Sequence, residues 1–270
     1  MTMERGVVGR LPFLPTGSGP PMLFVGGLSL EAGVDAAGTE WMTGSLLAPF
    51  ATRRRVLFVN RRPGLPRGIT MAELAAEHAD AIRALGAGPV DVAGISTGGS
   101  IAQQLAADHP DVVARLVLLC TACRLGPEGR VLQRRVAARV RAGAHRQALA
   151  VMMAGLVPPG RGQVAAGAVG WLAGPRLLAG DDDLADMATT IEAEDAFDLA
   201  ACARPIQTPT LILAGAQDRF YRPELFQETA RLIPGSRLRV FEGRGHVTVA
   251  RHPEWSPEIE RFLAGGDRPA

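Results

Sequence analysis

Cysteine is scarce in this chain, which has only three such residues, Cys120, Cys123 and Cys202. Three is too small a number, and an odd one, for a disulfide framework. Cys120 and Cys123 form a CxxC pair, a spacing found in redox and zinc sites. However, the pair starts at the end of a strongly apolar strand, and no second CxxC or nearby histidine completes four ligands. We therefore interpret both as small buried side chains and expect no metal.

Long apolar runs are also absent. No segment approaches the roughly 18 uncharged apolar residues that a membrane span needs, and residues 1–21 hold no apolar run of signal-peptide length. These absences exclude a membrane-spanning protein and favour a cytoplasmic one.

Neither sign of charge predominates, because 29 basic residues face 27 acidic ones and the net charge is +2. This balance gives no electrostatic reason to expect nucleic acid or an anionic membrane as a partner. Lysine is missing altogether, so every basic residue is arginine. Alanine, glycine and proline are abundant, and we attribute this composition to the genome rather than to function.

The chain does contain ample apolar sequence, since 47% of its 270 residues are hydrophobic. Short apolar runs alternate with segments of helical periodicity, which predicts an α/β fold with a mostly parallel central sheet flanked by helices. A helix is expected after the second run, capped by Thr70 and ended by Gly86. Most runs are apolar on both faces and predict buried strands at residues 22–25, 56–60, 90–95, 113–120, 209–214 and 237–241.

The alternation breaks after Cys123. Residues 131–157 and 183–197 look helical, and no strand is expected between 124 and 196. We therefore predict an α/β core at 1–122 and 198–270, with a helical cap at 123–197. Apolar residues of the cap either face a substrate pocket or pack within the cap, and the candidates are Met152, Met153, Trp171 and Leu172. A solvated outer face is expected for Arg134, Arg135, Arg139 and Arg141.

The strongest chemical signal is the segment GISTGGSIAQQLAADHP, which begins at Gly94. An apolar strand runs into a G-x-S-x-G motif centred on Ser96, and a helix-forming stretch follows at once. This is the context of a nucleophile elbow, a sharp turn that needs glycine at positions 94 and 98 and lifts the serine hydroxyl clear of the sheet. Ser96 is therefore the candidate nucleophile.

A serine nucleophile needs a base and an acid that orients the base, in the chain order serine, acid, histidine. His246 lies in FEGRGH just after the sixth strand, and Asp218 lies in LILAGAQD just after the fifth. The acid has rivals in residues 181–183, which we place in a solvated turn of the cap. Structural roles are expected for the remaining histidines, His78, His109, His145 and His252.

An oxyanion hole needs two backbone N–H groups that point at the developing negative oxygen. One is expected from Thr97, directly after the nucleophile. The other is expected from the loop after the first strand, where Gly26 and Gly27 allow a tight approach and Leu28 supplies the amide. Gly27 is also a candidate for the substrate pocket.

With these motifs in place the chain resembles the α/β-hydrolase family, in particular its small bacterial capped esterases, enol-lactonases and perhydrolase-like enzymes. The resemblance extends from about residue 21 to 263 and is most specific in GISTGGSIAQQLAADHP, PTLILAGAQDRFYRP and GRGH. It implies that Ser96, Asp218 and His246 correspond to the catalytic triad.

The chain departs from the family pattern at three places. Gly26 replaces the histidine of the usual His-Gly pair, which predicts a differently supported oxyanion loop. Residues 60–64 read NRRPG where relatives have Asp-x-Arg-Gly, so we expect an unusual front wall of the pocket. The region before Pro21 is short, which predicts that one or both of the family's leading strands are missing.

We expect a serine hydrolase that cleaves a small carboxylic ester or lactone through an acyl-enzyme, without metal or organic cofactor. A C–C bond hydrolase or a cofactor-free perhydrolase is the alternative on the same scaffold. A non-catalytic ligand-binding protein is the alternative of another class. The expected partner is a small-molecule substrate, with no nucleic acid and no membrane, and a homo-oligomer is left open.

Overall fold

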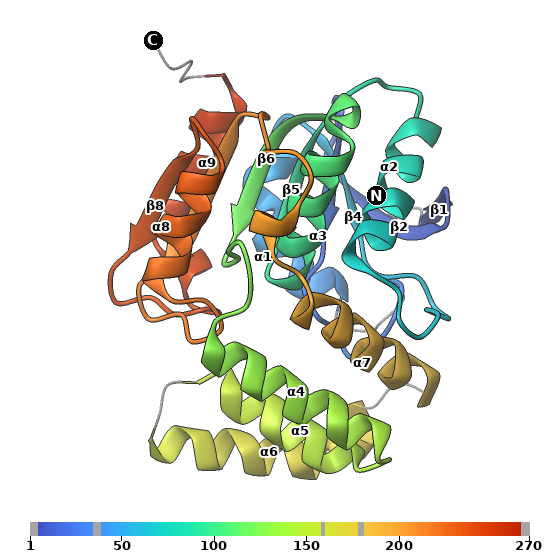
Figure 1. Cartoon of the computed structure of the whole chain (residues 1–270), viewed down its shortest axis with the longest axis vertical. Helices are drawn as coiled ribbons and strands as arrows, with labels where there is room; N and C mark the ends of the chain where they lie inside the picture. The colour runs from blue at the N-terminus through green and yellow to red at the C-terminus, as the bar shows by residue number, and fades with distance from the viewer. Residues whose placement is uncertain (1–4, 35–38, 158–159, 178–180, 266–270) are drawn as a thin grey trace.

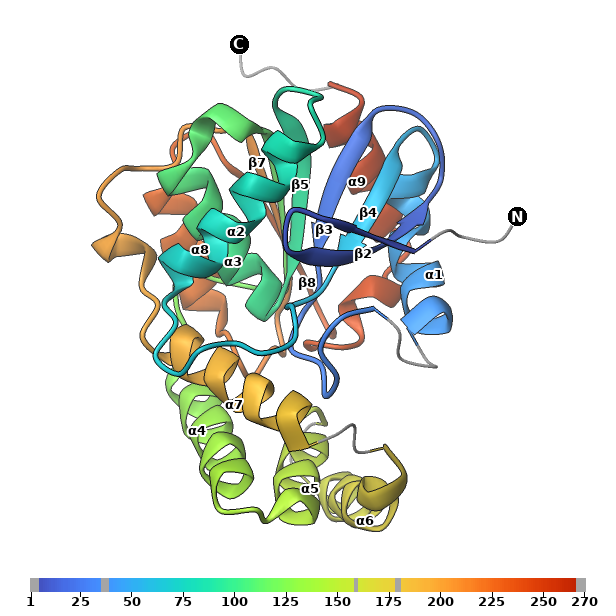
Figure 2. The same cartoon turned by 90° about the vertical axis from the view of Figure 1, so that its right-hand side faces the viewer.

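The computed structural model describes residues 5–34, 39–157, 160–177 and 181–265. Its central sheet has helices on both faces, and a group of further helices lies beyond one end of the strands (Figures 1 and 2). The strands are β1 (Gly6–Val8), β2 (Leu11–Thr16), β3 (Pro21–Val25), β4 (Arg55–Val59), β5 (Val90–Ile95), β6 (Val113–Leu119), β7 (Thr210–Gly215) and β8 (Arg237–Phe241). Their order in the sheet is β1-β2-β4-β3-β5-β6-β7-β8.

All strand pairs from β4 across to β8 are parallel, whereas the pairs β1–β2 and β2–β4 are antiparallel. The predicted fold class and all six predicted strands are confirmed. The expectation that leading strands are missing was wrong, because β1 and β2 are both present. Pro12 and Pro15 made β2 hard to predict, since proline is depleted in strands. Leu11 and Leu14 nevertheless anchor this strand in the core, with 1% exposure each.

The two faces of the sheet are buried by different helices. Along β3, Leu23 and Val25 pack toward one apolar cluster, whereas Met22 and Phe24 pack toward another. The first cluster lies under α2 (Met71–Ala84), α3 (Thr97–Asp108) and α8 (Pro223–Leu232), and the second under α1 (Thr39–Ala51) and α9 (Trp255–Leu263) (Figure 2). Burial on both faces explains why these strands read as apolar runs without alternation.

Helix α2 begins and ends as predicted. The Thr70 hydroxyl accepts a hydrogen bond from the Glu73 N–H, and the Glu73 carboxylate accepts one from the Thr70 N–H in return. Gly86 follows the helix with a φ of 63°, a conformation that glycine adopts without strain.

Between β6 and β7 the described residues form the inserted helices α4 (Pro127–Arg141), α5 (His145–Gly155), α6 (Arg161–Leu177) and α7 (Asp181–Asp195). Helices α4, α5 and α7 bury an apolar cluster, which includes Val136, Leu184 and Ile191. Helix α6 escaped prediction because its glycines lower helix propensity. At Gly170 a Cβ would lie 2.6 Å from the Leu149 carbonyl oxygen, so this glycine lets α5 and α6 approach closely.

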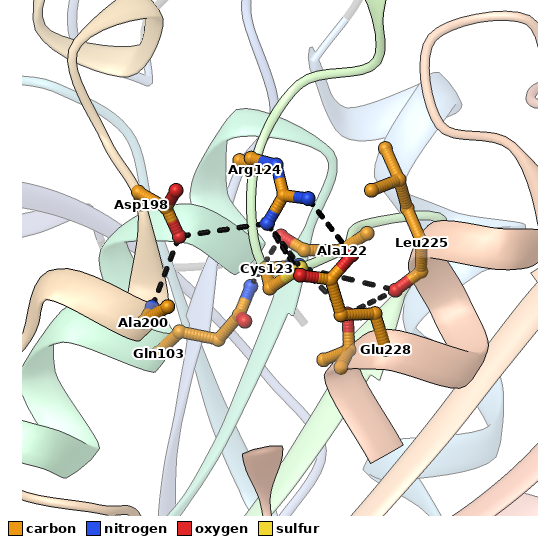
Figure 3. A network of polar contacts seen from close by, with 9 residues as sticks. Gln103, Ala122, Cys123, Arg124, Asp198, Ala200, Leu225 and Glu228 are labelled. Atoms are coloured by element: carbon orange, nitrogen blue, oxygen red, sulfur yellow. Dashed lines mark hydrogen bonds and ion pairs between the residues drawn. The ribbon is translucent and has the colours of Figure 1, made fainter. Parts of the chain in front are cut away.

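The chain enters and leaves this insertion at neighbouring points, shown close up in Figure 3. The Leu199 N–H donates to the Cys123 carbonyl at 2.8 Å, which joins the exit to the entry. Arg124 donates two hydrogen bonds to Glu228 of α8, at 2.6 and 2.8 Å, and lies 3.7 Å from Asp198. These contacts hold the entry to the insertion and its exit together and attach them to the core.

Cys120 and Cys123 are buried and form no disulfide, and burial raises the pKa of both thiols. Arg134 and Arg135 are exposed as expected, and Arg134 forms a surface ion pair with Asp195 of α7. Arg141 is instead half-buried and pairs with Glu192 of α7. Within the described ranges, no helix is long and apolar enough to cross a bilayer.

Candidate active site

The turn after β5 is tight and places Ser96 in an unusual conformation. Ser96 has φ 53° and ψ −126°, and α3 begins at the next residue, Thr97. A Cβ at Gly94 would overlap the carbonyl oxygen of Gly98, and a Cβ at Gly98 would overlap the carbonyl oxygens of Val25 and Gly26. Both glycines are therefore needed for the close approach of strand, helix and the loop after β3.

Gly98→Ala is expected to lower the free energy of unfolding by about 3 kcal/mol, because the added methyl group meets two backbone carbonyls that cannot move independently of the sheet. Urea unfolding measures the change. Gly44→Ala is the control, since Gly44 lies in α1 with nothing within 4 Å of an added Cβ. That variant should be neutral or slightly more stable, and equal stability changes at the two positions would contradict this account of the turn.

The structure brings the three predicted triad residues together at the carboxyl edge of the sheet. Ser96 follows β5, Asp218 follows β7 and His246 follows β8. The Nε2 atom of His246 lies 3.0 Å from Ser96 Oγ, and its Nδ1 atom lies 2.7 Å from Asp218 Oδ2. Both distances are those of good hydrogen bonds. The imidazole can therefore exchange a proton with Ser96 through Nε2, while the Asp218 carboxylate orients the ring through Nδ1.

Backbone hydrogen bonds hold the carboxylate of Asp218 in place independently of its contact with the imidazole. Its side chain is 0% exposed, and its Oδ1 atom accepts the backbone N–H groups of Phe220 at 2.9 Å and Tyr221 at 3.1 Å. The rings of these two residues flank His246, with centroids 4.6 and 6.0 Å from the imidazole centroid. The rival aspartates 181–183 instead form the first turn of α7, where Asp183 accepts the Ala32 N–H at 2.8 Å.

The loop that follows β3 lies against the start of α3. A Cβ on Gly27 would be 3.3 Å from Ser96 Cβ, so the loop passes directly beside the candidate nucleophile. Leu28 follows, and its side chain packs against the apolar cluster of the insertion together with Met152. Thr97, as the first residue of α3, has an N–H without an intrahelical acceptor. The assignment of the Leu28 and Thr97 amides to an oxyanion hole stays a prediction.

Polar groups after β4 support this loop, and sequence reasoning had noted them only as departures from the family pattern. The Asn60 amide donates to Ser29 Oγ at 2.8 Å and to the carbonyl oxygens of Glu31 and Gly33 at 3.0 and 2.9 Å. Beside Gly26, the Phe58 ring occupies the space, since a Cβ there would be 2.9 Å from its Cζ. An asparagine amide therefore supports the loop that begins at Gly26.

Arg61 adds to this support from a buried position. Its guanidinium donates to Ser29 Oγ at 3.1 Å and to the Leu30 carbonyl at 3.0 Å. Burial lowers its pKa to about 10, although the charges of Asp186 and Asp183 act in the opposite direction. A polar pair directly after a buried strand was the sequence signal that could have identified Asn60 and Arg61 as loop supports.

A cavity of about 200 Å³ adjoins the imidazole and is lined by Leu156, Val157, Arg219, Phe220, His246 and Val247, among others. Met152, Met153 and Trp171 do not line this cavity. Met152 and Met153 are half-buried on α5, and Met152 packs with Leu28. Gly27 lies beside Ser96. Trp171 is 46% exposed on α6, with the Arg146 guanidinium 5.1 Å from its ring centroid. Trp171 therefore lies at the surface of the insertion, and its place in a substrate pocket stays a prediction.

Comparison with known proteins adds to this geometry. A model of the alpha/beta hydrolase family matches residues 22–256. The chain is similar to a pimeloyl-[acyl-carrier protein] methyl ester esterase of Neisseria meningitidis serogroup B, with 33% identity over 211 residues, which cover 72% of this chain and 76% of that protein.

Two further likenesses extend over nearly all of the chain. It is similar to the polyketide synthase ThaQ of Burkholderia thailandensis, with 30% identity over 94% of this chain, although the match spans only 12% of the synthase. In structure it is similar to the enol-lactonase from Burkholderia xenovorans LB400, with a TM-score of 0.74 and 24% identity, covering 97% of this chain and 100% of that chain. The chain therefore belongs to the α/β-hydrolase family.

Proposed function

We propose that this protein is a serine hydrolase that cleaves a small carboxylic ester or lactone through an acyl-enzyme on Ser96. The observation that carries the proposal is the position of one imidazole between two partners, with His246 at 3.0 Å from the Ser96 hydroxyl and 2.7 Å from the Asp218 carboxylate. A hydroxyl, an imidazole and a buried carboxylate in this sequence make up the machinery of acyl transfer.

In the proposed mechanism His246 takes the Ser96 proton while Oγ attacks the substrate carbonyl. The amides of Thr97 and Leu28 donate to the oxyanion of the tetrahedral intermediate. The intermediate collapses, and the leaving alkoxide receives the proton from His246. A water molecule then attacks the acyl-enzyme with the same imidazole as base, which releases the acid and restores Ser96.

We place the substrate between the core and the inserted helices, with residues 123–197 as a cap. Three contacts support this arrangement: Leu28 and Leu30 pack against the apolar cluster of the insertion, and Asp183 holds the Ala32 N–H. The likeness to a methyl ester esterase supports a carboxylic ester, with a small alcohol as leaving group, as the preferred substrate.

A substrate panel tests the proposal. It contains p-nitrophenyl esters of increasing chain length, dimethyl pimelate, a small lactone and an aryl 1,3-diketone. We expect kcat/KM on the order of 10⁴ M⁻¹ s⁻¹ or more for the preferred ester, and a chain-length optimum set by the cavity. Turnover of the diketone alone would instead establish the C–C bond hydrolase, and a folded protein without turnover would leave a ligand-binding protein.

The acyl-enzyme itself has a separate signature. Phenyl and p-nitrophenyl butyrate pass through the same butyryl-enzyme, so added hydroxylamine must divide the product between acid and hydroxamate in the same ratio for both. Different ratios for the two esters would exclude a common covalent intermediate.

A further inference from the structure

Glu194, near the end of α7, carries a carboxylate that is completely buried. Its exposure is 0%, and the structure gives it no arginine or histidine partner among the contacts of the described residues. Isolated buried charges are costly unless hydrogen bonds replace the lost water. Such a group in the interior of a hydrolase calls for an explanation.

Four side chains donate to this carboxylate, two to each oxygen. Oε2 accepts from Thr97 Oγ1 at 2.7 Å and from Gln133 Nε2 at 2.9 Å, whereas Oε1 accepts from Ser100 Oγ at 3.0 Å and from the Tyr221 hydroxyl at 2.8 Å. An ionised carboxyl group offers about four lone-pair sites, so these donors satisfy it fully. Its negative charge also lies against the first turn of α3, where the helix dipole favours it.

The donors come from separate parts of the molecule. Thr97 and Ser100 belong to α3, which begins immediately after the candidate nucleophile. Gln133 belongs to α4 and Glu194 itself to α7, both within the insertion, and Tyr221 belongs to the loop after β7. The carboxylate thus joins two inserted helices to the first turn of α3 and to the loop after β7.

Both core partners adjoin triad residues. Thr97 is the neighbour of Ser96, and its amide is one of the two assigned to the oxyanion. The Tyr221 N–H donates to Asp218 Oδ1 at 3.1 Å, and its ring lies against the imidazole of His246 at 6.0 Å between centroids. Burial and the Glu194 charge raise the pKa of Tyr221 well above its usual value, so its hydroxyl stays protonated and keeps donating.

We propose that Glu194 is a positioning residue that holds the turn after Ser96 and the Tyr221 loop in register with each other, and so ties the placement of the inserted helices to the geometry of the triad. This inference rests on the proposed hydrolase function. Its consequence is specific: loss of the carboxylate misaligns nucleophile and base without changing the surface that binds substrate.

The test compares steady-state kinetics of wild type, Glu194→Gln, Tyr221→Phe and Thr97→Val, each corrected for the folded fraction from urea unfolding. Tyr221→Phe and Thr97→Val each remove one donor and keep the surrounding volume. Because small misplacements of reacting groups are costly, kcat should fall roughly 10- to 100-fold in each variant. KM should stay within about threefold, since substrate contacts are unchanged.

Two further variants separate positioning from simple stabilisation. Glu258→Gln changes another buried glutamate, 3% exposed on α9 and 3.1 Å from Arg237. It should leave kcat at the wild-type level even where stability falls. Thr97→Ser keeps a hydroxyl that can reach Glu194 and should retain about tenfold more kcat than Thr97→Val.

The outcomes are distinct. If the wild type hydrolyses esters and the three network variants lose stability but keep kcat and KM, the positioning role is wrong while the proposed function stands. If Glu194→Gln does not fold, the same decision rests on Tyr221→Phe and Thr97→Val. If the folded wild type hydrolyses no member of the panel, the proposed function and this inference fail together.

Discussion

Replacing Ser96 with alanine is expected to lower kcat for ester hydrolysis by about 10⁶-fold, the order of loss seen when a triad nucleophile is removed. The imidazole of His246 then has no hydroxyl within reach of Nε2, and the covalent route is closed. The variant is expected to keep a residual rate enhancement of about 10³–10⁴-fold over the reaction in water, because substrate binding and the oxyanion amides persist.

The measurement is the initial rate with the preferred ester of the panel, at enzyme concentrations high enough to detect the residual activity. Ser236→Ala is the matched control, since the Ser236 hydroxyl donates only to the Ala230 carbonyl in the turn between α8 and β8. It should retain wild-type activity. A Ser96→Ala protein that keeps a tenth of wild-type kcat would contradict the assignment of the nucleophile.

Asp218→Asn is expected to lower kcat by about 10⁴-fold while leaving the fold intact. The direction of the new amide is fixed by its surroundings. The N–H groups of Phe220 and Tyr221 still require an acceptor at the Oδ1 position, so the amide nitrogen must face His246. It then donates to Nδ1, which forces the proton onto Nε2, and that tautomer cannot accept the proton of Ser96.

Kinetics and urea unfolding together check this result. The control is Asp91→Asn, since Asp91 is also largely buried and ion-paired, with its Oδ2 atom 2.7 Å from Arg54 Nε at the opposite end of β5. Asp91→Asn should lose stability but not kcat. An Asp218→Asn variant that is unstable yet as active as wild type would limit Asp218 to a structural role.

The parts of the molecule that were predictable from sequence are those whose signals are local. The nucleophile turn is one, because the G-x-S-x-G motif between a strand and a helix lies within five residues, although the contacts that require Gly98 come from Val25 and Gly26. The buried strands are another, because burial on both faces leaves uninterrupted apolar runs. Asp218 and His246 could be predicted from the chain order of the triad and from their positions just after strands.

The features that escaped prediction depend on contacts between distant segments or on residues that oppose local propensity. The prolines of β2 and the glycines of α6 argue against strand and helix, and only tertiary packing overrides them. The network around Glu194 joins residues that are 97, 61 and 27 positions apart in sequence. A glutamate in the segment AEDAF carries no local sign of burial, so its role emerges only when the helices are in place.

The most direct test of the central claim is reaction of the folded wild-type protein with a fluorophosphonate probe, followed by digestion and mass spectrometry of the peptides. Only a serine activated by its neighbours reacts rapidly with such a probe. The account predicts a single adduct, located on Ser96 and abolished in Ser96→Ala. A folded wild type that stays unlabelled, or an adduct on another residue with Ser96 unmodified, would contradict it.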